Sequence, residues 1–228
     1  MPIAAALASV CGGRLVLVRG PDRPPPGVRP SEVSGSAVSY AEEYLAEHAG
    51  RLRAQGLQVE TATLPEGPVA QLIIDEAKDR SVDLVVMATH GRSGLGRVVY
   101  GGTSNAVLAR CPVPVLLARS WLGGSEAAAI QRDAQVMAPQ DGSDWARGAL
   151  PAARELAKAL GGALVEYAAP AGAAAGRAIG GTAAGIVVMS THGRGAPGRQ
   201  LLGSVADYVL RVGTVPLILV GPAALAGG

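Results

Sequence analysis

The chain of 228 residues is long enough for two small domains, and its 49% hydrophobic and 17% charged residues favour packed cores and exclude global disorder. A net charge of only +2, with no Lys/Arg cluster among aromatic residues, argues against nucleic-acid binding. No apolar run approaches the roughly 20 residues of a membrane span. Cys11 and Cys111 lie in unrelated contexts, which predicts neither a disulfide nor a metal site.

One segment of the sequence occurs twice. Residues 84–118 (LVVMATHGRSGLGRVVYGGTSNAVLARCPVPVLLA) and residues 186–220 (IVVMSTHGRGAPGRQLLGSVADYVLRVGTVPLILV) share 15 identities over 35 positions at a constant offset of 102. Each copy runs from an apolar stretch through a glycine-rich loop into a helical stretch and a final apolar run. A fixed offset of this kind predicts tandem repeats of one architecture.

Strands alternate with helices through the first repeat. The apolar runs at 84–88 and 113–118 are continuous, which is typical of parallel strands covered on both faces. Along the chain, the patterns predict a helix ending at Gly12-Gly13, a strand at 14–18, a helix at 31–55, a strand at 57–63, a helix at 67–79, a strand at 83–88, a helix at 102–110 and a strand at 113–118.

The second repeat follows a linker and has the same kinds of elements. We assign residues 1–119 to repeat one, 120–133 to the linker and 134–222 to repeat two. The predicted elements of repeat two are an opening strand from 134, a helix at 144–160, a strand at 163–168, a helix at 171–184 and the duplicated segment.

The two repeats are unequal. Residues 7–18 align with 156–167, so the start is predicted to be part of a core-facing helix and not a leader. Met1 then corresponds to Leu150, and repeat one has no counterpart of 134–149, which hold an opening strand and its Asp. Repeat two lacks about 47 residues, a helix and a strand, before Ile186. Unless such a strand precedes Met1, repeat one must borrow a strand from another domain or leave a gap in its sheet.

The duplicated loops carry a recognisable motif. The second copy reads Ser190, Thr191-His192, Gly193, nine residues, Gly203, Ser204; the first reads Ala88, Thr89-His90, Gly91, nine residues, Gly101, Gly102. With the Asp141 of PQDGS, this pattern resembles the universal stress protein (UspA-like) family. The resemblance implies two Rossmann-like, adenine nucleotide alpha hydrolase-like open parallel sheets in tandem, in an α/β protein.

The physical chemistry of the loop agrees with an anion site. Gly193 and Gly203 allow backbone angles closed to other residues and remove side chains that would bar a phosphate. Gly203-Ser204 opens a helix, whose free amides and dipole favour anions, and Ser204 adds a hydroxyl donor. Asp141 follows a strand, at the sheet edge where ligands of open α/β sheets bind. The Walker pattern is absent.

By this resemblance the chain is a cytoplasmic stress-response protein that binds ATP or AMP, with or without Mg²⁺, and has no catalytic residues or metal site of its own. Nucleic acid and membranes are not expected partners. The last strands, 113–118 and 215–220, are expected to pair between repeats or in a homodimer. The expected nucleotide site consists of Asp141, Met189, Ser190, Gly193, Gly203, Ser204 and Val205, and a weaker second site consists of Ala88, Gly91, Gly101 and Thr103.

Two other functions stay open. The truncated repeats would also suit a dimerisation or interaction module that binds no nucleotide. A slow ATPase or adenylate-transfer enzyme would need a base or lysine near the phosphates, and the loops carry no Lys. His90 and His192 occupy equivalent positions, where shaping of the loop is favoured over catalysis. Arginines 92, 97, 194 and 199 either screen phosphate charge or are solvated.

Overall fold

The structure is a computed structural model, and it describes residues 2–20, 30–88, 101–119, 122, 124–169, 173–192 and 202–226. Repeat one has the alternation of helices and strands that its sequence predicts, with boundaries shifted by one or two residues at most ends. Its elements are α1 (Pro2–Cys11), β1 (Arg14–Arg19), α2 (Pro30–Arg53), β2 (Gln58–Thr63), α3 (Val69–Asp79), β3 (Val85–Ala88), α4 (Gly102–Arg110) and β4 (Val115–Ala118).

Repeat two differs from prediction in its helices, and the helix expected at 171–184 ends at Gly180. The expected helix at 144–160 is two helices, because Pro151 has no N–H to donate to the carbonyl of Arg147. A 3₁₀ helix, η2, interrupts the linker, and a short last helix was not predicted. The elements from the linker on are η2 (Ser125–Ala129), β5 (Val136–Gln140), α5 (Asp144–Gly148), α6 (Leu150–Leu160), β6 (Leu164–Ala168), α7 (Ala173–Gly180), β7 (Ile186–Ser190), α8 (Ser204–Val212), β8 (Leu217–Val220) and α9 (Pro222–Ala226).

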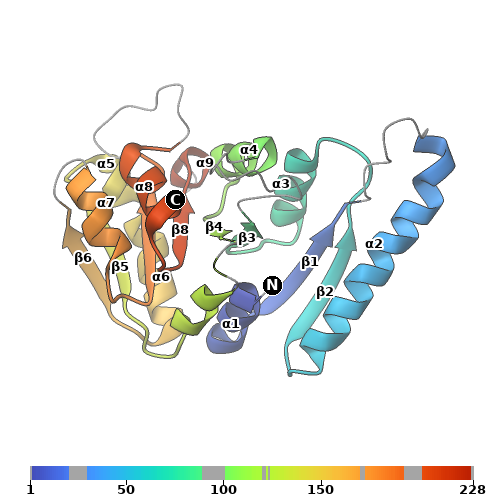
Figure 1. Ribbon diagram of the computed structural model, residues 1–228, viewed down its shortest axis with the longest axis horizontal. Coiled ribbons are helices and arrows are strands. Elements are labelled where there is room, and N and C mark those ends of the chain that lie inside the picture. The colour runs from blue at the N-terminus through green and yellow to red at the C-terminus, as the bar shows by residue number, and fades with distance from the viewer. Residues whose placement is uncertain are drawn as a thin grey trace.

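Strands of both repeats share one sheet of six strands, in the order β3-β4-β8-β7-β5-β6 (Figure 1). All neighbouring strands are parallel except β4 and β8, which pair antiparallel. Leu116 of β4 faces Ile218 of β8, and these two residues are equivalent at the offset of 102, so a local two-fold axis passes between them. The α/β class and the tandem arrangement are confirmed, and the sheets of the two repeats are joined through their last strands.

Helices cover both faces of this sheet. One core lies between the sheet and α3, α4, α7 and α8, and the other lies between the sheet and α1 and α6. Each parallel connection returns over a face, as expected of a doubly wound fold. No helix in the described part of the chain is long and apolar enough to cross a membrane.

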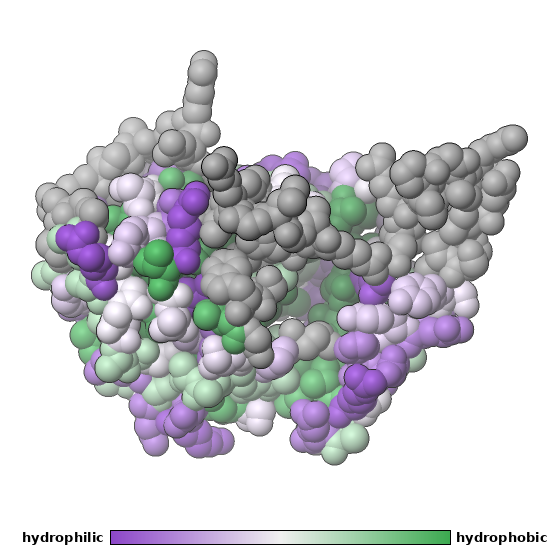
Figure 2. Space-filling view, viewed as in Figure 1, coloured by the Kyte–Doolittle hydropathy of each residue, from purple (hydrophilic) through white to green (hydrophobic). Residues whose placement is uncertain are grey.

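The first two strands of repeat one form a separate sheet. β1 and β2 pair in parallel over six residues and, with α2, extend away from the six-stranded sheet (Figure 1). Ala41, Leu45, Ala49 and Leu52 of α2 pack on this pair, and Figure 2 shows polar side chains over the outer surface of the helix. Among the described residues no strand lies between β1 and β3, which is the position that β5 occupies between β6 and β7.

This difference changes the burial of equivalent strands. All five residues of β7 are buried, whereas none of the four residues of β3 is fully buried. The registers with the last strands are the same, since Val85 pairs with Val115 as Val187 pairs with Leu217. The greater exposure of β3 therefore comes from the edge opposite β4. The equivalent edge of β7 is covered by β5.

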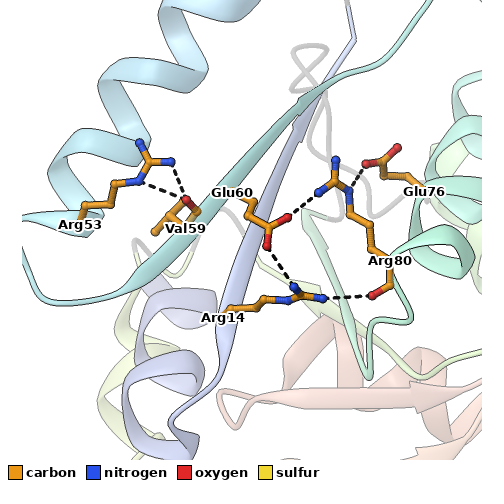
Figure 3. A network of polar contacts seen from close by, with 6 residues as sticks. All are labelled: Arg14, Arg53, Val59, Glu60, Glu76 and Arg80. Carbon is orange, nitrogen blue, oxygen red and sulfur yellow. Dashed lines mark hydrogen bonds and ion pairs between the residues drawn. The ribbon is translucent and has the colours of Figure 1, made fainter.

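Ion pairs tie the β1–β2 sheet to the rest of repeat one (Figure 3). Glu60 of β2 accepts from Arg14 at 3.0 Å and from Arg80, at the end of α3, at 2.6 Å. Arg80 also pairs with Glu76, and Arg14 donates to the Arg80 carbonyl at 3.3 Å. The hydrogen bond to Glu76 and the charges of Glu76 and Glu60 raise the pKa of Arg80 above its ordinary value, so its guanidinium stays charged.

Candidate functional site

The candidate site lies where the direction of the chain reverses across the sheet. β5 has β6 on one side and β7 on the other, and both neighbours are parallel to it. The chain winds from β5 to β6 in one direction and returns past β5 to β7. The carboxyl ends of β5 and β7 therefore diverge into helices on opposite faces, which is the topological switch point at which open α/β sheets bind ligands.

Asp141 follows β5 at this point and begins a tight turn. Its Oδ1 accepts hydrogen bonds from the N–H of Ser143 at 3.0 Å and from the Ser143 hydroxyl at 2.6 Å. Gly142 has φ +84°, which favours glycine there. The Ser143 Oγ in turn accepts from the N–H of Ala146 at 3.1 Å and caps α5. The carboxylate is thus held in place by its own turn.

The start of α8 faces the same edge from the β7 side. Gly203 is the N-cap, and without a side chain it leaves the first-turn amides of α8 uncapped. Its N–H donates to the carbonyl of Thr191 at 2.7 Å, which fixes the helix start against the end of β7. Ser204 is exposed as the first helical residue, and Val205 is partly buried against the core.

The expected backbone role of Gly203 is wrong. Its φ of −65° and ψ of 156° are extended values open to any residue. The property that Gly203 contributes is therefore the missing side chain and not an unusual conformation. The predicted opening of a helix at Gly203-Ser204 is confirmed, as it is for Gly101-Gly102.

Side chains at the end of β7 point into the protein. Met189 belongs to the core beneath α7 and α8, and the buried Ser190 hydroxyl donates to the carbonyl of His192. His192 is only 8% exposed; its Nδ1 lies 3.0 Å from the Thr191 Oγ1, and its ring packs at a tilt on Trp145, 5.8 Å between centroids. These contacts shape the turn. The main-chain groups of Ser190 lie on the side of β7 that faces β5, beyond the last paired residue, and are available to a ligand, whereas those of Met189 face β8.

The weaker site in repeat one has fewer of these groups. Gly101 is the N-cap of α4 with φ −58°, Gly102 replaces Ser204, and the partly buried Thr103 follows. Ala88 ends β3, and its carbonyl lies 3.5 Å from the Ser104 hydroxyl. In the described part of the chain, no strand beside β3 presents a carboxylate as β5 presents Asp141.

Some predicted residues cannot be placed, and others were missed. Gly91, Gly193, His90 and the four loop arginines lie outside the described residues. The structure brings Asp141, Ser190, Gly203, Ser204 and Val205 to one edge of the sheet. Sequence reasoning did not assign roles to Ser143 or Thr191. The Asp-Gly-Ser turn pattern signals the first, because an Asp side chain commonly bonds the backbone two residues on. The sequence contains no such signal for Thr191.

The fold and this edge define an open, doubly wound α/β protein with a candidate anion site at its switch point. A sequence model of the universal stress protein family matches residues 3–119 and 177–221, more than two thirds of the chain. The chain belongs to the universal stress protein family. Asp141 lies between the two matched segments, so its role rests on the geometry of the turn and not on the family match.

Individual relatives agree. A universal stress protein of Mycolicibacterium smegmatis is 30% identical over 82% of this chain and 76% of its own length. One from Thermus aquaticus is 37% identical over 32% of this chain, and a Coxiella burnetii homologue is 47% identical over 21%. The matches span only 57% and 33% of those two proteins.

Solved structures share the fold. A universal stress protein from Archaeoglobus fulgidus superposes with a TM-score of 0.71 over 96% of this chain and 93% of its own, at 19% identity. A Pseudomonas aeruginosa protein described as functionally unknown has a TM-score of 0.62 over 97% and 87% of the two chains, at 18% identity. At these identities the likeness concerns the fold alone.

Proposed function

We propose that the chain binds an adenine nucleotide, ATP or AMP, with or without Mg²⁺, at the switch point between β5 and β7. One observation carries this proposal: Asp141 after β5 and the uncapped start of α8 flank the same point of the sheet. A carboxylate accepts hydrogen bonds from a nucleoside, and helix-start amides donate to phosphate oxygens.

The residues fit such a ligand. The N–H of Gly203 is already bonded to Thr191, so the phosphate donors are the amides of Ser204 and Val205 and the exposed Ser204 hydroxyl. No side chain at the N-cap blocks them. The bound nucleotide acts as the signalling molecule. The chain orients this nucleotide and complements its charge. We infer a role in the stress response, in the cytoplasm, from membership of the family.

Calorimetry and thermal shift with ATP and AMP test this proposal. Asp141→Asn keeps an oxygen acceptor for the Ser143 turn but removes the charge, and we expect affinity to fall about tenfold, the value of a hydrogen bond to a charged group. The matched control is Asp144→Asn, three residues on and fully solvated. Absence of heat and of any thermal shift at millimolar nucleotide refutes nucleotide binding.

Ser204→Ala tests the helix start separately. Ser204 is exposed and follows the N-cap Gly203, so loss of its hydroxyl should leave the fold unchanged and weaken phosphate binding about tenfold. Ser125→Ala is the control, because Ser125 is also an exposed first helical residue after a glycine N-cap. Equal effects of the two substitutions on affinity would contradict phosphate contact at Ser204.

The two alternatives have their own observations. Pairing of β4 with β8 supports association of the repeats within one chain, and an interaction module needs nothing more. Hydrolysis is disfavoured, because His192 is buried against Thr191 and Trp145. A robust ATPase rate that His192→Ala abolishes would reverse this conclusion.

A further inference from the structure

A fully buried arginine joins the end of repeat one to repeat two. Arg119 directly follows β4 and is 1% exposed. Its guanidinium donates to Glu126 Oε1 from Nε at 3.0 Å and from one terminal nitrogen at 2.7 Å, and to the carbonyls of Val209 at 3.2 Å, Gly213 and Val215. All five of its N–H donors are thus accounted for.

Three of these acceptors belong to the C-terminal end of α8 and the turn after it. The last carbonyls of a helix have no partners within the helix, and a cation is favoured at this end by the helix dipole. Glu126, in the linker helix η2, neutralises the charge and also accepts from the Arg119 N–H at 2.9 Å. Arg119 therefore fastens the linker and the end of β4 to the C-terminal end of α8.

In the described part of the chain, the contact of Arg119 with α8 has no counterpart across the local two-fold axis. The position equivalent to Arg119 is Gly221, which follows β8 as Arg119 follows β4. A Cβ at Gly221 would lie inside van der Waals contact with the carbonyl oxygen of Leu108 in α4, so no side chain fits there. Among the described residues, α8 receives a buried guanidinium from the other repeat, whereas a carbonyl near the end of α4 accepts from the exposed Arg110 of the same helix at 3.5 Å. The helix α8 starts with Gly203-Ser204, whereas α4 starts with two glycines.

We propose that Arg119 is a positioning residue for the nucleotide site of repeat two, and this inference rests on the proposed function. The nine residues of α8 place its first turn about 13 Å from its pinned end. Ala206, Val209 and Leu210 bury one side of the helix. A helix held at its far end cannot slide along this apolar contact. Together with the bond from the Gly203 N–H to the Thr191 carbonyl, this anchor keeps the first-turn amides beside the end of β7.

This role assigns a function to the end of repeat one. In the described part of repeat one no residue corresponds to Asp141, yet this repeat supplies the side chain that orients the phosphate-binding helix of repeat two. Ligand binding at Ser204 and the association of the two repeats are then coupled, because both depend on one placement of α8.

The test removes both charges, since Arg119→Met alone would leave Glu126 buried without its cation. We compare Arg119→Met/Glu126→Met with Arg80→Met/Glu76→Met, which removes another arginine–glutamate pair at a helix end, in repeat one (Figure 3). Hydrogen–deuterium exchange of the Gly203 and Asp207 amides, which donate to the carbonyls of Thr191 and Gly203, is followed without nucleotide. AMP affinity is measured calorimetrically well below the melting temperature.

In the Arg119 double variant we expect exchange of the Gly203 and Asp207 amides to rise and AMP affinity to fall, each about tenfold, with β5 exchange unchanged. The Arg80 pair should leave both unchanged. Wild-type exchange and affinity in the Arg119 double variant overturn the proposal. If wild-type protein binds no AMP, the proposed function fails, and exchange alone decides whether Arg119 positions α8.

A second variant covers failure of the first to fold. Arg119→Lys keeps the pair with Glu126, but one ammonium cannot reach carbonyls at 209, 213 and 215 together. We expect cooperative melting, with faster exchange and weaker AMP binding than wild type. Cooperative melting with wild-type exchange of the Gly203 and Asp207 amides overturns the proposal.

Discussion

Strand β3 should tolerate truncation of its side chains far better than its equivalent β7. Val188 is 0% exposed, and Val86, at the same position of repeat one, is partly buried on the same face of the sheet. Val188→Ala removes two buried methyl groups, worth about 1.6 kcal/mol in transfer, and leaves a cavity in a site with no room to relax. The expected loss of unfolding free energy is about 2.5 kcal/mol, against about 1 kcal/mol for Val86→Ala.

Urea unfolding of the three chains measures these values, with equal slopes required for the comparison. A further chain tests the cause directly: a copy of residues 134–149 is fused ahead of residue 1, which continues the alignment of Met1 with Leu150. In this background Val86→Ala should cost about as much as Val188→Ala, roughly 2.5 kcal/mol. Equal costs for the two truncations in the parent chain would refute the argument that an open edge exposes β3.

Three further results are expected. Gly221→Ala should lower the free energy of unfolding by about 3 kcal/mol in chemical denaturation, because the new methyl group would overlap the Leu108 carbonyl. An unchanged free energy of unfolding would show that the backbone moves to relieve this overlap. Burial raises the pKa of the Cys11 and Cys111 thiols. Alkylation of both should therefore be slower than that of a free thiol at neutral pH, and it should become faster as the pH rises. Faster labelling of the buried Cys111 than of Cys11 would contradict this expectation. Ser143→Ala should cost about 1 kcal/mol in thermal unfolding by uncapping α5, and a neutral result would remove that role.

Local signals in the sequence predicted most of the fold. Gly12 and Gly161 end equivalent helices with φ of +65° and +73°, and the next glycine of each pair donates to a carbonyl five residues back. These features depend only on neighbouring residues. The continuous apolar runs predicted the buried strands β4, β7 and β8 for the same reason.

What the sequence did not reveal depends on distant contacts. Arg119 follows an apolar strand and would ordinarily be solvated, and its partner Glu126 lies in a segment that reads as a linker. Burial of this pair becomes favourable only when carbonyls about 90 residues away complete the set of acceptors. The joining of the two sheets is likewise a long-range pairing, between strands 102 residues apart.

The unequal losses in the two repeats explain why one site, and not two, is expected. Among the described residues, repeat two has no elements beyond β6, away from its switch point, and repeat one presents no strand that would form a switch point with β3. Gly102→Ser restores the missing hydroxyl, and a side chain there meets open space. Without a carboxylate beside β3, this change should not create a second site. Calorimetry should therefore give one nucleotide per chain for both wild type and Gly102→Ser, and two per chain for the variant would show that the helix start alone suffices.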